Sequence, residues 1–138
     1  MKIVINKCYG GYSINDECFE AVLKRKGTIY YKSTPEDAAY FSLIGYNYYS
    51  VPENEYNVIY ENDKKQGNYA KSNALCLNSN DIPRDDIDLI AVLETLGVNN
   101  FAGAYAALKI VEIPDGVDWE IEEYDGKEWV AEVHRTWS

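Results

Sequence analysis

The chain has 138 residues, of which 13 are basic and 23 acidic, so its formal net charge is −10. This length suits one domain with a sizeable core, and a composition that is 46% hydrophobic and 26% charged is typical of a folded globular protein. The acidity argues against nucleic-acid binding through a basic patch, because phosphate contacts draw on clustered lysine and arginine.

The charge is distributed unevenly along the chain. Residues 1–69 carry a net charge of −1 and residues 70–138 carry −9, so a basic partner protein would meet the second half. The alternative is that this charge serves solubility alone. No apolar run approaches the ~20 residues of a membrane span, and no secretory signal is recognisable. Three cysteines without a C-x-x-C pair suit a reducing compartment. We therefore expect a cytoplasmic protein with no membrane partner and no direct nucleic-acid partner.

The first part of the chain predicts a strand, a glycine-containing turn and a helix. Residues 2–7 form a short apolar run of the kind that becomes a buried strand. Ser13 is expected to cap the helix that follows. The apolar residues Ile14, Cys18 and Val22 are spaced by four, which places them along one face of that helix.

The middle of the chain is dense in tyrosine and asparagine and predicts mostly short elements. Residues 28–32 suit a strand, and residues 34–37 have the cap, proline and acidic residues that start a short helix. Residues 56–60 and 74–77 also suit strands. Residues 61–72 are expected to form an exposed loop.

The second half predicts one helix and three strands. Pro83 is expected to open a helix over residues 84–96, and residues 105–113 read as a strand. Residues 119–133 contain two alternating runs joined by Asp125-Gly126. Asp-Gly between such runs is the strongest short-range signal for a β-hairpin.

Together these elements predict an α+β fold in a single domain, residues 1–138. The expected architecture is a mixed or antiparallel sheet with an N-terminal β-loop-α unit, a second helix near residues 84–96 and a C-terminal β-hairpin. No repeat, low-complexity tract or clear linker divides the chain.

The best candidates for a ligand site lie in the first turn, before the second helix and near the C-terminus. Two glycines between a strand and a helix let backbone N–H groups approach an anion such as phosphate. Neighbouring tyrosines offer stacking area, and arginine and histidine offer donors to phosphate. The candidate ligand-binding residues are Tyr9, Gly10, Gly11, Tyr12, Ser13, Arg84, His134 and Arg135. The alternatives are a tight turn followed by an ordinary cap, and Arg135 paired with one of many acids.

The residue pattern gives little support to catalysis or metal binding. A lone histidine cannot form a histidine-based metal site, and no serine or cysteine stands beside it as a nucleophile. The acids near residues 81–88 lack the spacing of a calcium loop and instead complement a helix dipole. We therefore expect no enzyme activity, no metal and no cofactor.

Tyrosine is the most distinctive residue of this chain. It supplies 13 of the 19 aromatic residues, and asparagine is also plentiful. Tyrosine offers rigid stacking area and asparagine offers adaptable hydrogen bonds, so the two together favour a recognition surface without catalysis.

Three segments resemble a family of small proteins encoded by bacteriophages and prophages. They are the opening MKIVINKCYGGYS, the helix segment DDIDLIAVLETLG from Asp85 to Gly97, and the closing EIPDGVDWEIEEYDGKEWVAEVHRTW. The resemblance covers about the first 25 residues and most of residues 81–137, and residues 40–75 are unmatched. It implies a viral origin and carries over no activity and no site residue.

A phage origin favours a role against host defence. The implied function is a non-catalytic sponge, a homo-oligomer in the host cytoplasm that binds a small nucleotide-derived immune signal without cleaving it. One alternative is an acidic inhibitor that covers a basic nucleic-acid-binding surface of a host defence protein. Another is a virion or assembly accessory protein.

Overall fold

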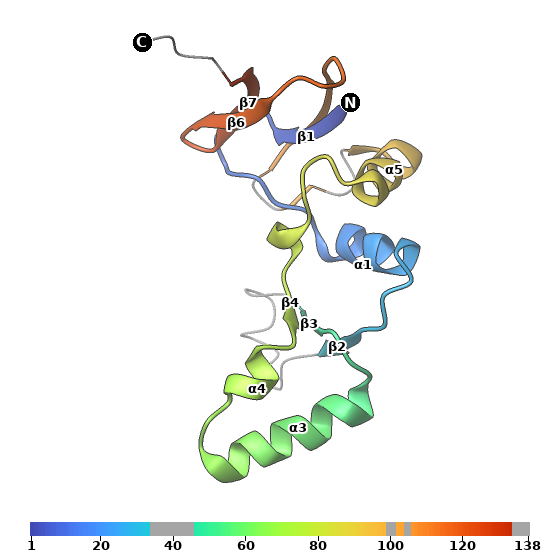
Figure 1. Cartoon of the computed structure of the whole chain (residues 1–138), viewed down its shortest axis with the longest axis vertical. Coiled ribbons are helices and arrows are strands. Elements are labelled where there is room, and N and C mark those ends of the chain that lie inside the picture. The colour runs from blue at the N-terminus through green and yellow to red at the C-terminus, as the bar shows by residue number, and fades with distance from the viewer. Residues whose placement is uncertain (34–45, 99–101, 104–105, 134–138) are drawn as a thin grey trace. The chain divides into compact units, whose positions relative to one another are not determined.

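The computed structural model describes residues 1–33, 46–98, 102–103 and 106–133. The fold is α+β with antiparallel strand pairs, as the sequence predicts (Figure 1). The predicted helix start at residues 34–37 lies outside the described residues. In chain order the elements are β1 (Lys2–Asn6), α1 (Asp16–Arg25), β2 (Tyr31–Ser33), β3 (Asn47–Tyr49), α3 (Glu53–Gln66), α4 (Ala70–Asn73), β4 (Cys76–Leu77), the 3-10 helix η1 (Ser79–Asp81), α5 (Ile87–Leu96), β5 (Leu108–Glu112), β6 (Trp119–Tyr124) and β7 (Lys127–Glu132).

Contacts between residues divide the chain into two compact units. Unit 1 contains residues 1–22 and 82–138, and unit 2 contains residues 23–81; the single domain over residues 1–138 stays a prediction. Unit 1 has 6 basic and 16 acidic residues, a net charge of −10, whereas unit 2 has 7 of each and no net charge. Unit 2 also holds 9 of the 13 tyrosines. Acidity and tyrosine enrichment therefore belong to different parts of the molecule.

Unit 1 contains two antiparallel strand pairs. Strand β1 pairs with β5, with Lys2 opposite Glu112 and Asn6 opposite Leu108, and β1 also lies beside β7 of the β6–β7 hairpin. Asp125 and Gly126 both have positive φ, 54° and 89°, as the two-residue turn of a tight hairpin requires. The predicted C-terminal hairpin is confirmed.

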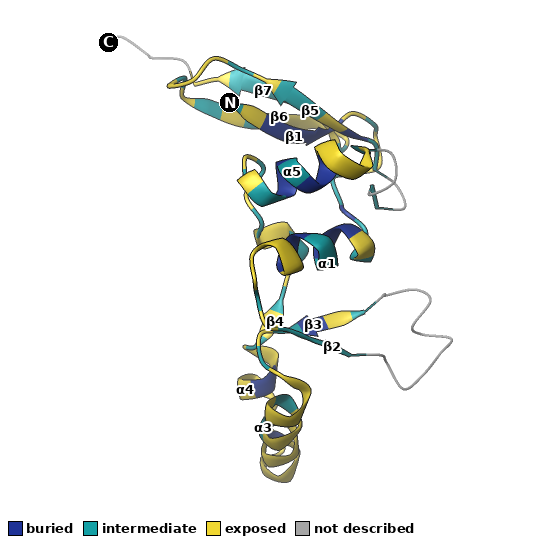
Figure 2. Ribbon diagram, turned by 90° about the vertical axis from the view of Figure 1, so that its right-hand side faces the viewer, coloured by how far each residue is buried: buried dark blue, intermediate teal, exposed yellow. Residues whose placement is uncertain are grey.

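The core of unit 1 is built from one face of each helix and from most of β1. Figure 2 shows buried residues along β1, α1 and α5, and α5 contacts β1. Four consecutive residues of β1 are buried, because its side chains are covered on both faces. The buried apolar side chains of unit 1 are Ile3, Val4, Ile5, Ile14, Cys18, Phe19, Val22, Leu89, Ile90, Val92, Leu93 and Leu108.

Helix α1 begins later than the sequence predicts. Its first residue is Asp16, and the side chain of Asn15 accepts a hydrogen bond from the backbone N–H of Cys18 at 2.9 Å. The predicted cap at Ser13 is therefore wrong. The Ser13 carbonyl accepts instead from the N–H of Gly103 at 2.9 Å. Asparagine is as good a cap as serine, and tertiary pairing decided which of the two was used.

Helix α5 begins at Ile87, three residues after the predicted start at residue 84. The carboxylate of Asp86 accepts from the backbone N–H groups of Asp88 and Leu89 at 2.9 and 3.0 Å. A carboxylate at this position satisfies first-turn donors and complements the helix dipole. The second helix predicted near residues 84–96 is otherwise confirmed.

Unit 2 contains a three-stranded antiparallel sheet with the order β2–β3–β4. Its central strand β3 carries the buried Tyr48. Helices α3 and α4 contact each other, and α3 also contacts β2. No helix among the described residues combines the length and the apolar character needed to cross a membrane.

Helix α3 corrects two predictions. Residues 56–60, expected as a strand, lie within it, and residues 61–72, expected as a loop, contain its end and α4. Acidic residues occupy its first turn and basic residues its last, and Gly67 ends it with a left-handed φ of 67°. These signals at the two ends favour a helix and outweigh the weak strand preference of tyrosine, valine and isoleucine.

Candidate functional site

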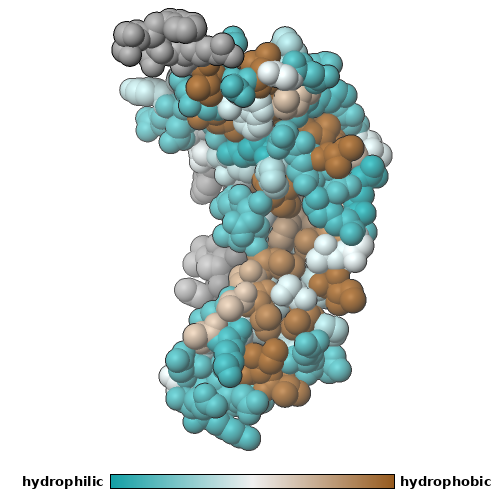
Figure 3. All heavy atoms as spheres, viewed as in Figure 1, coloured by the Kyte–Doolittle hydropathy of each residue, from teal (hydrophilic) through white to brown (hydrophobic). Residues whose placement is uncertain are grey.

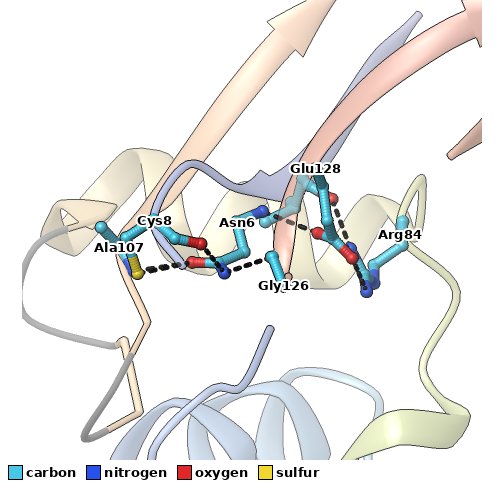
Figure 4. A network of polar contacts seen from close by, with 7 residues as sticks. Asn6, Cys8, Arg84, Ala107, Gly126 and Glu128 are labelled. Atoms are coloured by element: carbon cyan, nitrogen blue, oxygen red, sulfur yellow. Dashed lines mark hydrogen bonds and ion pairs between the residues drawn. The ribbon is translucent and has the colours of Figure 1, made fainter. Parts of the chain in front are cut away.

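A network of polar contacts in unit 1 is centred on Asn6 at the end of β1 (Figure 4). Asn6 is fully buried. Its side-chain amide donates to the carbonyls of Cys8 and Gly126 at 2.8 and 2.7 Å, and its side-chain oxygen accepts from the N–H of Ala107 at 2.9 Å. One side chain thus joins the first loop, the start of β5 and the hairpin turn.

A buried ion pair adjoins this network. The guanidinium of Arg84 donates to both oxygens of the Glu128 carboxylate, at 2.7 and 2.9 Å. The side chains of Arg84 and Glu128 are 22% and 7% exposed. The same carboxylate accepts from the backbone N–H of Asn6 at 2.7 Å, and Arg84 also donates to the carbonyl of Val4 at 3.2 Å. Bidentate pairs of this kind combine strong attraction with a fixed geometry.

The ring of Tyr12 covers one face of this guanidinium. The Arg84 Cζ lies 3.3 Å from the ring centroid, which is a cation–π contact. The Tyr12 hydroxyl is buried and has no hydrogen-bond partner among the described residues. Burial raises the pKa of Tyr12 to about 12, and the charge of Arg84 opposes that rise. The hydroxyl is therefore protonated at neutral pH.

The structure thus brings together Tyr12 and Arg84, two of the residues predicted for a ligand site. It also shows what the glycine turn does. Gly11, and not Gly10, takes the positive φ of 89°. A Cβ on Gly126 would lie 2.5 Å from the Gly11 nitrogen, so the close backbone approach serves the hairpin turn. Helix α1 begins five residues after Gly11, so the turn does not run directly into the helix.

The other predicted site residues have separate surroundings. Tyr9 is exposed, and the Nζ of Lys127 lies 5.6 Å from its ring centroid. Ser13 is bonded through its carbonyl to Gly103. His134 and Arg135 lie outside the described residues. A ligand site at these positions stays a prediction, and the charge of Arg84 is already balanced by a carboxylate.

A second site lies in unit 2, where five tyrosine rings follow one another in contact. We call this set the tyrosine ladder. Neighbouring centroids are 6.1, 4.1, 5.9 and 5.6 Å apart, within the usual range for aromatic pairs. In order, its members are Tyr31, Tyr49, Tyr56, Tyr60 and Tyr69.

Strand register and helix spacing build the ladder. Tyr31 and Tyr49 are direct partners in the β2–β3 pairing. Tyr56 and Tyr60 lie four residues apart on α3, so they share one face of the helix. The buried carboxylate of Asp63 accepts from the backbone N–H of Ser72 in α4 at 2.7 Å, which ties α4 and the preceding Tyr69 to α3.

The ladder ends at the molecular surface. Tyr60 and Tyr69 are 36% and 39% exposed. Burial and a hydrogen bond with Tyr49 raise the pKa of Tyr56, so this hydroxyl stays protonated at neutral pH. On the face drawn in Figure 3, apolar side chains gather over the region of β2–β4 and α3. The exposed rings of Tyr60 and Tyr69 offer aromatic faces for stacking and hydroxyls for hydrogen bonds.

Sequence reasoning missed the residues that complete both sites. Glu128 shares a face of the hairpin with Val130 and Ile121, and this alternation of apolar residues was the available signal that one glutamate points inward. Tyr56 and Tyr60 were assigned to a strand, which hides their helical spacing. The surplus of tyrosine was visible, but its arrangement was not.

The described residues also include a small pocket, but no cluster of metal-ligating side chains. Within the described ranges, no three histidine, cysteine, aspartate or glutamate side chains are grouped to hold a metal ion. A pocket of about 180 Å³ lies at one end of the hairpin, lined by residues such as Ile113, Trp119 and Val130. Pockets for small ligands usually measure about 300–1,000 Å³, so this one is too small for a nucleotide.

Comparisons with protein-family models, with curated proteins and with solved structures found no match for this chain. Function is therefore inferred from the chemistry of its own residues.

Proposed function

We propose that this chain is a phage-encoded, non-catalytic binding protein that holds a small nucleotide-derived signal in the host cytoplasm without cleaving it. The ligand binds at the exposed end of the tyrosine ladder, where a base stacks on Tyr60 or Tyr69. Sequestration lowers the free concentration of the signal and so acts against host defence.

The observation that carries this proposal is the run of five tyrosine rings in contact. Stacking on aromatic side chains binds any base through its π-face and is worth about 1–3 kcal/mol per base. A ring that is already packed against its neighbours loses little conformational freedom on binding. The ladder is therefore preorganised for a planar ligand.

The acidic residues are concentrated in unit 1, which matters for an anionic ligand because net negative charge repels phosphate. The net charge of −10 belongs to unit 1, and unit 2, which carries the ladder, has none. Unit 2 as a whole therefore has no excess of acidic residues that would repel a phosphate group. Unit 2 also contains a positive charge beside an aromatic ring, because the Nζ of Lys32 lies 3.7 Å from the ring centroid of Tyr46.

Two features of the described residues favour binding over chemistry. The shifted pKa values of Tyr12 and Tyr56 are both raised, which keeps the hydroxyls protonated and makes them poor nucleophiles. Arg84 and Glu128 satisfy each other in a buried pair. The two charges therefore balance each other inside unit 1.

Native mass spectrometry of the whole protein with cyclic dinucleotides and ADP-ribose tests the proposal. We expect a stoichiometric adduct of unchanged ligand mass, carried by a homo-oligomer of this chain. Replacing both exposed tyrosines, Tyr60→Ala with Tyr69→Ala, should weaken binding by about 5- to 150-fold, the loss of one stacked base.

The matched control is Tyr124→Ala, which removes an exposed tyrosine from unit 1 and should leave affinity unchanged. Replacing Tyr60 and Tyr69 by phenylalanine keeps the stacking area and should retain most of the binding. A product mass would overturn the non-catalytic assignment. Bare protein across the whole panel would overturn nucleotide sequestration for those ligands.

A further inference from the structure

The β6–β7 hairpin of unit 1 has one covered face and one open face. Side chains alternate along each strand, and the register places Glu120, Glu122 and Tyr124 on the same face as Ala131, Trp129 and Lys127. We call this set the hairpin face. The opposite face carries the buried Glu128.

The hairpin face exposes two large aromatic side chains. Trp129 is 44% exposed and Tyr124 is 69% exposed, although tryptophan normally buries most of its surface. Glu120 and Glu122 are exposed on the same face, and neither forms an ion pair with another described residue. Aromatic area next to carboxylates that no cation balances is the composition of a surface that meets a cationic partner.

Trp129 is held in place by its carboxylate neighbour. Its indole Nε1–H donates to the Glu122 carboxylate at 3.0 Å, and the two residues are direct cross-strand partners. This bond uses the edge of the indole and leaves the π-face for a ligand. One oxygen of Glu122 is engaged, and the other is available as an acceptor.

The same chain already shows how such a pair holds a guanidinium. On the covered side, Arg84 lies 3.3 Å from the ring centroid of Tyr12 and forms a bidentate pair with Glu128. Trp129 and Glu122 repeat this combination of ring and carboxylate on the open side, without an arginine from the described residues. Tryptophan binds cations better than tyrosine does.

We propose that the hairpin face docks an arginine-rich segment of another protein, with one guanidinium stacked on Trp129 and paired with Glu122. Unit 1 carries the entire net charge of −10, which attracts and orients such a segment before contact. This surface would serve the acidic inhibitor that the sequence left as an alternative. It shares no residue with the tyrosine ladder, so it stands independently of nucleotide sequestration.

Fluorescence anisotropy with a labelled nona-arginine peptide, at low and at physiological salt, tests the proposal on the whole protein. Trp129→Ala should weaken binding about threefold to fivefold, the usual strength of an exposed cation–π contact. Separately, the double variant Glu120→Gln with Glu122→Gln should weaken binding of the peptide about twofold to fivefold for each lost charge. Nona-lysine should bind more weakly than nona-arginine, because an ammonium is more strongly hydrated than a guanidinium and cannot stack flat on the indole ring.

The control is Glu17→Gln with Asp85→Asn, two exposed acids of unit 1 that lie off the hairpin face. It removes the same charge as the double glutamine variant. An equal loss of affinity in this control would show that the peptide responds to the net charge of unit 1 as a whole, and it would overturn the site. Unchanged binding in the Trp129→Ala variant would overturn it as well. Circular dichroism checks that each variant is folded.

Discussion

The Arg84–Glu128 pair should contribute strongly to the stability of unit 1, and Glu128→Gln tests this. The substitution keeps the size of the side chain and one acceptor oxygen. It removes the charge that faces Arg84 and turns an amide NH₂ group toward a guanidinium that has only donors. The carboxylate also accepts from the backbone N–H of Asn6, so the loss reaches the network around β1.

The expected cost follows from the burial of the two side chains. Removing one partner of a fully buried pair costs about 3–5 kcal/mol. Arg84 is 22% exposed and Glu128 7%, so water recovers part of the loss and we expect about 2–4 kcal/mol. For a urea dependence of about 2 kcal/mol per M, the middle of the usual range, the midpoint of unfolding should fall by roughly 1–2 M.

Urea unfolding followed by tryptophan fluorescence is the assay, because all three tryptophans belong to unit 1. The control is Glu123→Gln on the neighbouring strand. Glu123 is exposed and lies opposite Glu128 in the register, so its neutralisation should be neutral or slightly stabilising. If the two variants differ by less than about 0.5 kcal/mol, the pair behaves as an exposed one and the reasoning from burial is refuted.

Two further variants probe the same unit with the same assay. Tyr12→Phe removes a buried hydroxyl that has no partner among the described residues and should stabilise the protein by about 1 kcal/mol. Folding raises the pKa of Tyr12 from 10.0 to about 12, so the wild type should lose stability as the pH rises from 10 to 12. The Tyr12→Phe variant should lack this part of the pH dependence, and a variant with the same pH profile as the wild type would contradict the prediction. Gly126→Ala should cost about 2–4 kcal/mol, because its φ is 89° and the new Cβ would lie 2.5 Å from the Gly11 nitrogen. Gly116→Ala, with φ of 78° and open space around it, should cost only about 1 kcal/mol, and equal costs would rule out the close approach as the cause.

Local signals were sufficient for several elements of this protein. The Asp125-Gly126 turn lies between two alternating runs, and only residues that tolerate positive φ fit such a turn, so the hairpin follows from a few neighbouring residues. Strand β1 and the apolar face of α1 were likewise predictable, because a short apolar run before glycines favours a strand and a four-residue apolar spacing favours a helix. These elements also fix the α+β class.

Helix α3 marks the limit of this local reading. Tyrosine, valine and isoleucine in residues 56–60 prefer strands only weakly, and the signals that decide the helix lie outside that window, in its first turn, its last turn and Gly67. Packing then adds contacts that favour the helix, since Tyr56 stacks on Tyr49 at 4.1 Å. The ladder forms because the strand register aligns two of its rings, the helix spacing aligns two more, and the two pairs pack against each other.

The two sites depend on contacts between distant residues. Asn6 and Glu128 are 122 positions apart, and Arg84 and Glu128 are 44 apart. Sequence supplied the residue types, a surplus of tyrosine and an excess of acid, and its alternation indicated which hairpin residues share a face. Only the tertiary structure decided that Glu128 is paired inside while Glu122 and Trp129 are exposed, because burial and partner choice are properties of the folded chain and not of any short segment.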